Sequence, residues 1–344
     1  MTFSGKVRGA APPFLAIGVG LILAGLAVLP LGVSPWRFYG ELFSGTLGSG
    51  FGFGQVLARS TPLLFTGLAV ATAFQAKLFN IGGEGQMLLG ALAIAVVGTQ
   101  VGGLPAPLAW GLALGAGALA GAVWGSIPGL LKARTGAHEV IVTILLNFIA
   151  FALVNYLLVQ WLALPETVRT ATIADSAQIP RLSDTFPWFR GSPANWVWLF
   201  GLGLAVILHF WQSRSALGLS FRILGDGAGV ARYAGLSTGR LTAAVMTFSG
   251  ALAGLAGASF VLGYKHYFED GLSGGAGFLG IAVALLARNR PLWIIPSAFF
   301  FGLLSYGGFV VNRIVPRELL NVIEAVILLL FILFDRWFAD RSTE

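Results

Sequence analysis

The chain contains no cysteine and only three histidines among its 344 residues. The missing thiols exclude a disulfide framework, a thiolate metal site and a cysteine nucleophile. His138, His209 and His266 are too widely separated in sequence to form a metal-binding motif. We therefore expect neither a metal site nor a catalytic residue on this chain.

Charge is also scarce, because only 10% of the residues are charged whereas 56% are hydrophobic, and the mean hydropathy is +0.84. A soluble domain has roughly a quarter of its residues charged. The apolar runs here are continuous for about 20 residues, the length a helix needs to cross about 30 Å of hydrocarbon, and they lack the alternation of a membrane barrel. The sequence predicts an all-α, polytopic transmembrane helical bundle.

Ten apolar segments, some of them broken or short, are candidate membrane spans. They cover residues 14–34, 56–75, 85–101, 107–131, 139–162, 196–212, 240–263, 275–287, 291–311 and 319–335. The segment 275–287 is too short to cross a bilayer alone. We expect these spans to form one transmembrane domain over residues 1–344.

The net charge of +7 is better explained by basic cytoplasmic loops than by nucleic-acid binding. Most lysines and arginines fall on one side of the drawn topology, which places both termini in the cytoplasm. The outer loop 163–195 is expected to form an irregular cap. The inner loop 213–239 is the most basic segment, and it is either a plain topology signal or a docking surface for a cytoplasmic partner.

Nucleotide chemistry is not expected on this chain. No glycine-rich run precedes a Lys-Ser or Lys-Thr pair, so the phosphate-binding P-loop is missing. The serines also lack a convincing base partner in sequence. A membrane enzyme is therefore a minor alternative.

Two glycine clusters indicate an inverted internal repeat with halves at about 56–162 and 240–335. "NIGGEGQMLLGALAIAVVG" resembles "LSGGAGFLGIAVALLA", so that Gly82, Gly83 and Gly85 match Gly274, Gly275 and Gly277. Such clusters beside short apolar segments are typical of broken helices whose free backbone groups face a central pathway.

Several polar residues near these clusters have two possible roles. Glu84 either caps a helix N-terminus, where the helix dipole favours an acid, or takes part directly in solute passage. Glu139, Thr143 and Asn147 share one helical face and either form interhelical hydrogen bonds or line the pathway. The same alternatives apply to Asn80 and Gln86.

Four motifs in this order, "LFNIGGEGQMLLGA", "HEVIVTILLNFIA", "RILGDGAGVARYAGLS" and "GFLGIAVALLARNRP", resemble those of the membrane-spanning permeases of bacterial ABC importers for nucleosides and simple sugars. The resemblance covers about residues 55–335. It implies a location in the bacterial cytoplasmic membrane and no cofactor on this chain. It also implies a second, identical or related permease subunit, an extracytoplasmic substrate-binding protein, and a cytoplasmic ATPase that holds ATP and Mg.

The resemblance also assigns an ATPase-docking segment within loop 213–239. Its matching residues are Arg222, Gly225, Asp226, Ala231, Arg232, Tyr233 and Gly235. The chain departs from the family pattern at Gly227 and Ala228, where an Asn-Pro pair is usual, and a looser helix start is expected there.

A small neutral solute, most of all a nucleoside, fits the lack of a basic intramembrane cluster. The "FNIGGEGQ" form points to the nucleoside branch, and a simple sugar such as ribose or galactose is the alternative. An ion-coupled secondary transporter would share inverted repeats but would place ionisable groups in mid-membrane. Glu84 and Glu139 are the only candidates for such groups.

Overall fold

The computed structural model describes residues 3–340, and these residues form helices without any named strand. The main helices, in chain order, are α1 (Phe3–Ala27), α2 (Pro35–Leu47), α3 (Gly50–Gln75), α4 (Gly83–Gln100), α5 (Ala106–Thr135), α6 (Glu139–Leu157), α7 (Leu182–Thr185), α8 (Val197–Arg214), α9 (Ala216–Asp226), α10 (Ala228–Tyr233), α11 (Thr238–Gly254), α12 (Ala258–Val261), α13 (Ala276–Leu286), α14 (Pro291–Val311) and α15 (Glu318–Asp340). The predicted all-α bundle is confirmed.

Each of the ten predicted spans corresponds to a helix, although their edges differ by several residues. Six helical segments of the described chain are long and apolar enough to cross a membrane by length and composition. The helix α13 has only 11 residues, or about 16 Å, so it covers about half of the hydrocarbon thickness as the sequence predicts. The helix α2 was not predicted, and α3 begins at Gly50, six residues before the expected edge.

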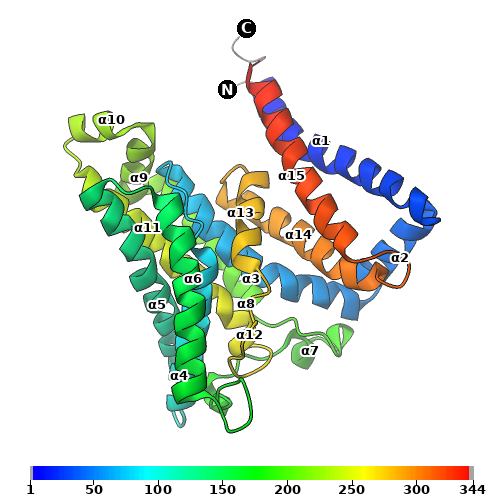
Figure 1. The fold of residues 1–344 in the computed structure, drawn as a ribbon, viewed down its shortest axis with the longest axis horizontal. Helices are drawn as coiled ribbons and strands as arrows, with labels where there is room; N and C mark the ends of the chain where they lie inside the picture. Colours follow the sequence, from blue (N-terminus) through cyan, green and yellow to red (C-terminus); the bar gives the residue numbers. More distant parts are fainter. Residues whose placement is uncertain (1–2, 341–344) are drawn as a thin grey trace.

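The helix α3 is the central element of the bundle, since 89% of its most apolar stretch is buried, compared with 22% for α5 and for α6. An apolar helix that is buried all round lies inside a bundle, whereas α5 and α6 expose leucine, isoleucine and phenylalanine side chains that suit a lipid surface. In Figure 1, α1, α2 and α15 stand at one end of the molecule and α4, α5 and α6 at the other.

Glycines spaced by four residues bring α5 and α11 into backbone contact. A Cβ atom on Gly121 would lie 2.2 Å from the carbonyl oxygen of Gly250, and a Cβ on Gly254 would lie 2.2 Å from that of Gly117. Side chains larger than hydrogen cannot fit between these helices. This close approach is the usual way in which transmembrane helices gain van der Waals contact in lipid.

The outer loop 163–195 packs on the segment 262–272, as the expected irregular cap. The amide of Ile173 donates to the carbonyl of His266 at 2.8 Å, and the amide of Ile179 donates to that of Leu262 at 2.8 Å. The loop thereby satisfies its backbone groups without regular strands.

The described ends of the chain lie on one side of the molecule. In Figure 1, α1 begins and α15 ends at the top, where α9 and α10 are also found, whereas α7 and the outer loop lie toward the bottom. The predicted orientation of this side toward the cytoplasm stays a prediction.

Candidate functional site

Two helices begin face to face at the predicted glycine clusters. The helix α4 starts at Gly83, and α13 starts at Ala276 directly after Gly275. A Cβ on Gly277 would lie only 2.3 Å from the Cα of Glu84, so the absence of a side chain permits this contact. We call Ser273, Gly277 and Glu84 the junction.

The carboxylate of Glu84 bridges the two helix starts. One of its oxygens accepts the amide N–H of Gly277 at 2.7 Å, and the other accepts the hydroxyl of Ser273. The side chain is only 2% exposed. Free N–H groups and the positive end of the dipole both favour an acid at a helix N-terminus, so Glu84 caps α13 as well as lying in the first turn of α4.

The two helices run in opposite directions away from the junction. Near the far end of α4, the carbonyl of Gly98 accepts the amide of Ala174 in the outer loop at 2.9 Å. Just beyond α13, Arg288 lies 2.8 Å from Asp335 near the end of α15, on the side of α9 and α10 (Figure 1). This arrangement is the one that oppositely oriented repeats would produce, although the repeat halves remain a prediction.

Buried amides fix the backbone that leads into α4. The amide nitrogen of Asn80 donates to the Oε1 of Gln86 at 2.9 Å and to the hydroxyl of Ser249 at 2.8 Å. Asn147 accepts the amide of Gly85 at 3.0 Å and donates to the carbonyl of Ile81 at 2.9 Å. These hydrogen bonds give the non-helical residues 76–82 the internal partners that backbone needs at membrane depth.

Glu139 and Thr143 form an ion pair and a hydrogen bond with neighbouring residues of the protein. Glu139 pairs with Lys132 at the turn between α5 and α6, and the hydroxyl of Thr143 donates to the carbonyl of Glu139 at 2.7 Å. The Thr143 side chain also lies against Gly82. Both residues thus pack near the entry to α4.

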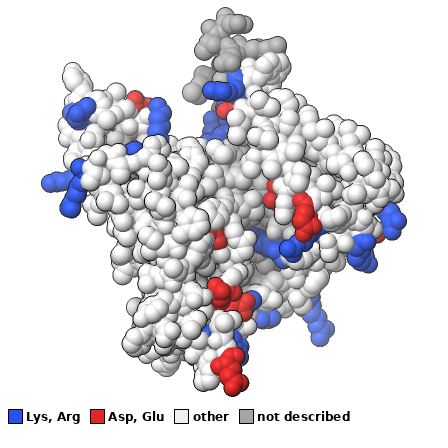
Figure 2. Space-filling model, viewed as in Figure 1, with Lys and Arg blue, Asp and Glu red and all other residues white. Residues whose placement is uncertain are grey.

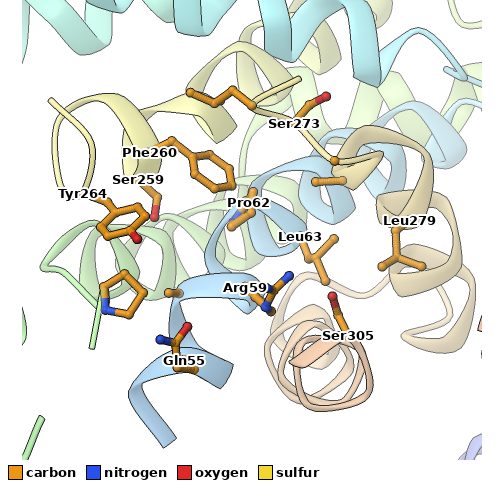
Figure 3. Close-up of a pocket in the computed structure, with 15 residues that line it drawn as sticks. Gln55, Arg59, Pro62, Leu63, Ser259, Phe260, Tyr264, Ser273, Leu279 and Ser305 are labelled. Carbon is orange, nitrogen blue, oxygen red and sulfur yellow. The ribbon is translucent and has the colours of Figure 1, made fainter. Parts of the chain in front are cut away.

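Two cavities lie beside the junction, and they share a wall. The smaller has a volume of about 250 Å³ and is lined by Gln55, Arg59, Tyr264 and Ser273 among others (Figure 3). The larger has a volume of about 730 Å³ and extends along α13 toward Arg317 and Glu324 on and beside α15. The shared wall consists of Arg59, Gly274, Leu279 and Ser305.

Of the predicted pathway residues, Gly274 lines both cavities and Gly275 lines the larger one. The lining of these two cavities does not include Asn80, Gly82, Gly83, Glu84, Gly85, Gln86, Glu139, Thr143, Asn147 or Gly277. Glu84 and Gly277 form the junction, and Asn80, Gln86 and Asn147 hydrogen-bond at the start of α4. Their predicted part in solute passage stays a prediction.

Sequence reasoning missed the polar side chains that α3 and α14 contribute. Gln55 and Arg59 are four residues apart and therefore share a face of α3, and Ser305 faces them from α14 (Figure 3). The four-residue spacing of Gln55 and Arg59 was visible in the sequence.

The predicted ATPase-docking residues lie together on α9, α10 and the turn after α10. Arg222, Asp226, Arg232, Tyr233 and Gly235 are exposed, and the exposed fraction of Tyr233 is 97%. Gly225 and Ala231 are buried instead. A Cβ on Gly225 would lie 2.1 Å from the carbonyl oxygen of Gln75, so this glycine seats α9 on the end of α3.

The departure at Gly227 and Ala228 has a local consequence. Gly227 precedes α10 with φ of +143°, a conformation that favours glycine, and it has no side chain to cap the helix. The resulting α10 has only six residues. Basic side chains lie over this region at the upper left of Figure 2, whereas much of the face shown is uncharged.

Comparison with known proteins identifies the family of this chain. The family described as "Branched-chain amino acid transport system / permease component" matches residues 52–333. The chain is 38% identical to a guanosine ABC transporter permease protein of Bacillus subtilis, over 92% of this chain and 91% of the relative.

Two further relatives are similar over most of their length. A glucose ABC transporter permease protein of Haloferax volcanii is 34% identical, over 93% of this chain and 86% of the relative. A nucleoside ABC transporter permease protein of Lactococcus lactis subsp. cremoris is 31% identical, over 94% and 90%. With its apolar helices and paired helix starts, the chain belongs to this family of ABC transporter permease components.

Proposed function

We propose that this chain is the membrane permease subunit of an ATP-driven importer of nucleosides in the bacterial cytoplasmic membrane. The observation that carries the proposal is the cavity of about 250 Å³ beside the junction, lined by Gln55, Ser259 and Ser305, by the guanidinium of Arg59 and by apolar groups. Several donors and acceptors of this kind, with a single charged side chain among them, suit a polar solute. The guanosine and nucleoside relatives support the same solute class.

Energy would come from a separate chain. The proposed partners are a cytoplasmic ATPase that holds ATP and Mg, a second permease subunit and an extracytoplasmic substrate-binding protein. The exposed side chains of α9 and α10 provide a polar surface for the ATPase, and Gly225 ties that surface to α3. Movement of the docked helices would thereby reach the helix that lines the cavity, as alternating access requires.

A simple sugar is the second candidate solute. The glucose permease relative favours it, and hydroxyl-rich sugars would use the same neutral groups. An ion-gradient-driven transporter is less well supported, because Glu84 is committed to Ser273 and Gly277 and Glu139 to Lys132.

Uptake measurements test the proposal. Cells that lack their own nucleoside uptake would express this chain together with the ATPase and binding protein that copurify with it. We expect radiolabelled guanosine to accumulate, unlabelled nucleosides to compete more strongly than ribose, galactose or glucose, and ATP depletion to abolish uptake. Uptake that survives ATP depletion and collapses with the ion gradient would contradict the proposal, and preferential competition by sugars would select the second candidate.

A further inference from the structure

Arg59 forms part of the wall between the two cavities beside the junction. It lies on α3 and lines both the cavity of about 250 Å³ and the cavity of about 730 Å³. Figure 3 shows its side chain among Leu63, Gln55 and Ser305, between helices α3 and α14. A solute that passes from one cavity to the other must therefore come within reach of this guanidinium.

The guanidinium has hydrogen-bond donors to spare. Its central carbon lies 4.4 Å from the centre of the Phe309 ring, a cation–π contact that stabilises the charge but satisfies no N–H donor. Its Nε is buried and has no hydrogen-bond partner among residues 3–340. The ion pairs found among the described side chains also do not include Arg59.

A buried donor without a partner costs free energy, and a solute that accepts its hydrogen bonds would recover that cost. An anion is one possible acceptor, because Arg59 and Arg317 line the larger cavity together with a single carboxylate, that of Glu324. A neutral acceptor is the other, because the smaller cavity offers the amide of Gln55 and the hydroxyl of Ser305 and has no carboxylate in its lining. The neutral acceptor agrees with the proposed solute class, and competition by an anionic nucleotide distinguishes the two.

Resting on the proposed function, we propose that Arg59 selects 6-oxopurine nucleosides, such as guanosine and inosine, by donating to the O6 and N7 atoms of the base. The planar guanidinium presents parallel N–H groups that match this pair, as in arginine contacts to guanine in DNA. Adenosine has an amino donor in place of O6, and pyrimidine nucleosides lack N7. Both should be transported less efficiently.

The test compares uptake efficiency, the maximal rate divided by KM, for radiolabelled guanosine and adenosine in the same cells. The permease is assayed with its partners as wild type, Arg59→Gln and Arg59→Lys. Arg313→Gln is the matched control, since Arg313 is exposed and pairs with Glu41 at 2.9 Å, away from the lining of both cavities.

We expect the wild type and the control to prefer guanosine over adenosine, and Arg59→Gln to lower that preference roughly 10-fold or more. Arg59→Lys should keep part of it, because lysine donates as a point charge. The preference is the ratio of guanosine to adenosine uptake efficiency within one variant, so a reduced protein level does not change it. If Arg59→Gln does not accumulate in the membrane, the Arg59→Lys variant provides the test.

An unchanged preference in the Arg59 variants, a wild type without any preference, or stronger competition by guanosine monophosphate than by guanosine would overturn the inference. These results differ from failure of the proposed function, in which the wild type would import no nucleoside at all.

Discussion

Glu84 is a buried carboxylate in a chain that has few charges, and its partners explain its position. It accepts hydrogen bonds from the amide of Gly277 and the hydroxyl of Ser273. It thereby joins the starts of α4 and α13, and Glu84 and Gly277 are 193 residues apart in sequence. The dipoles of α4 and α13 both favour a negative charge at this point. Glu84 therefore acts as a structural brace, by which we mean that its hydrogen bonds hold the starts of α4 and α13 together.

Replacement of Glu84 by alanine would leave the Gly277 amide and the Ser273 hydroxyl without their acceptor. We expect the free energy of unfolding to fall by about 1–3 kcal/mol, measured as a lower Tm in detergent, with Glu84→Gln intermediate because its amide oxygen can still accept. Glu318→Ala is the control, since Glu318 is exposed and its pair with Arg317 at 3.3 Å should contribute little. Equal Tm values for Glu84→Ala and Glu318→Ala would refute the brace.

At this scale, sequence reasoning found Glu84 but not its partner. The glycine and the acid indicated a helix start, because local chemistry decides where a helix can begin. The contact with Gly277 depends on how distant elements pack, and only the weak similarity between the two glycine clusters pointed to it. Arg59 was not predicted as a site residue for a related reason, since several separate helices form the cavity wall to which it belongs.

Helices α5 and α11 pack closely because the glycines at their contact have no side chains. Gly117, Gly121 and Gly125 recur every four residues, and each faces the backbone of α11 or the α4 side chain of Ile94 at distances that exclude a Cβ. The spacing was visible in the sequence, but glycine is common in transmembrane helices and the partner could not be identified from it.

A larger side chain at this contact should separate the two helices. We expect Gly121→Leu to lower the free energy of unfolding by about 1–3 kcal/mol or more, measured by thermal unfolding in detergent and by the yield of folded protein. Gly115→Leu on the same helix is the matched control, because a Cβ at Gly115 meets nothing within 4 Å. If both variants were equally stable, the close contact of α5 with α11 would not be present in the native protein.

Helix positions were more predictable than helix ends and short helices. Apolar length located a helix at each of the ten predicted segments, and six helical segments of the described chain are long and apolar enough to cross a membrane. The helix α2 was not predicted because its 13 residues include Arg37, Glu41, two glycines and a serine, a composition that resembles a loop. The burial of Phe38 and Leu42 against the neighbouring helices stabilises it.

On the scale of the whole molecule, the cavity and the predicted docking residues lie on helices that contact each other. Helix α3 lines the cavity with Gln55 and Arg59 at one end, and its other end, at Gln75, supports α9 through Gly225. The helix has 26 residues and spans about 39 Å, with Pro62 between the cavity residues and Gln75. We expect a displacement of α9 and α10 to reach the cavity wall through this one helix.

The most direct measurement is the uptake of radiolabelled guanosine by the assembled transporter with the double substitution Arg232→Ala and Asp226→Ala. Truncation of important interface side chains costs about 2 kcal/mol or more, so we expect uptake to fall roughly 30-fold or more while the chain stays in the membrane. Arg190→Ala with Glu318→Ala removes the same charges at exposed positions outside α9 and α10 and should leave uptake unchanged. Normal uptake by the Arg232 and Asp226 double variant would contradict ATPase-driven transport through α9 and α10.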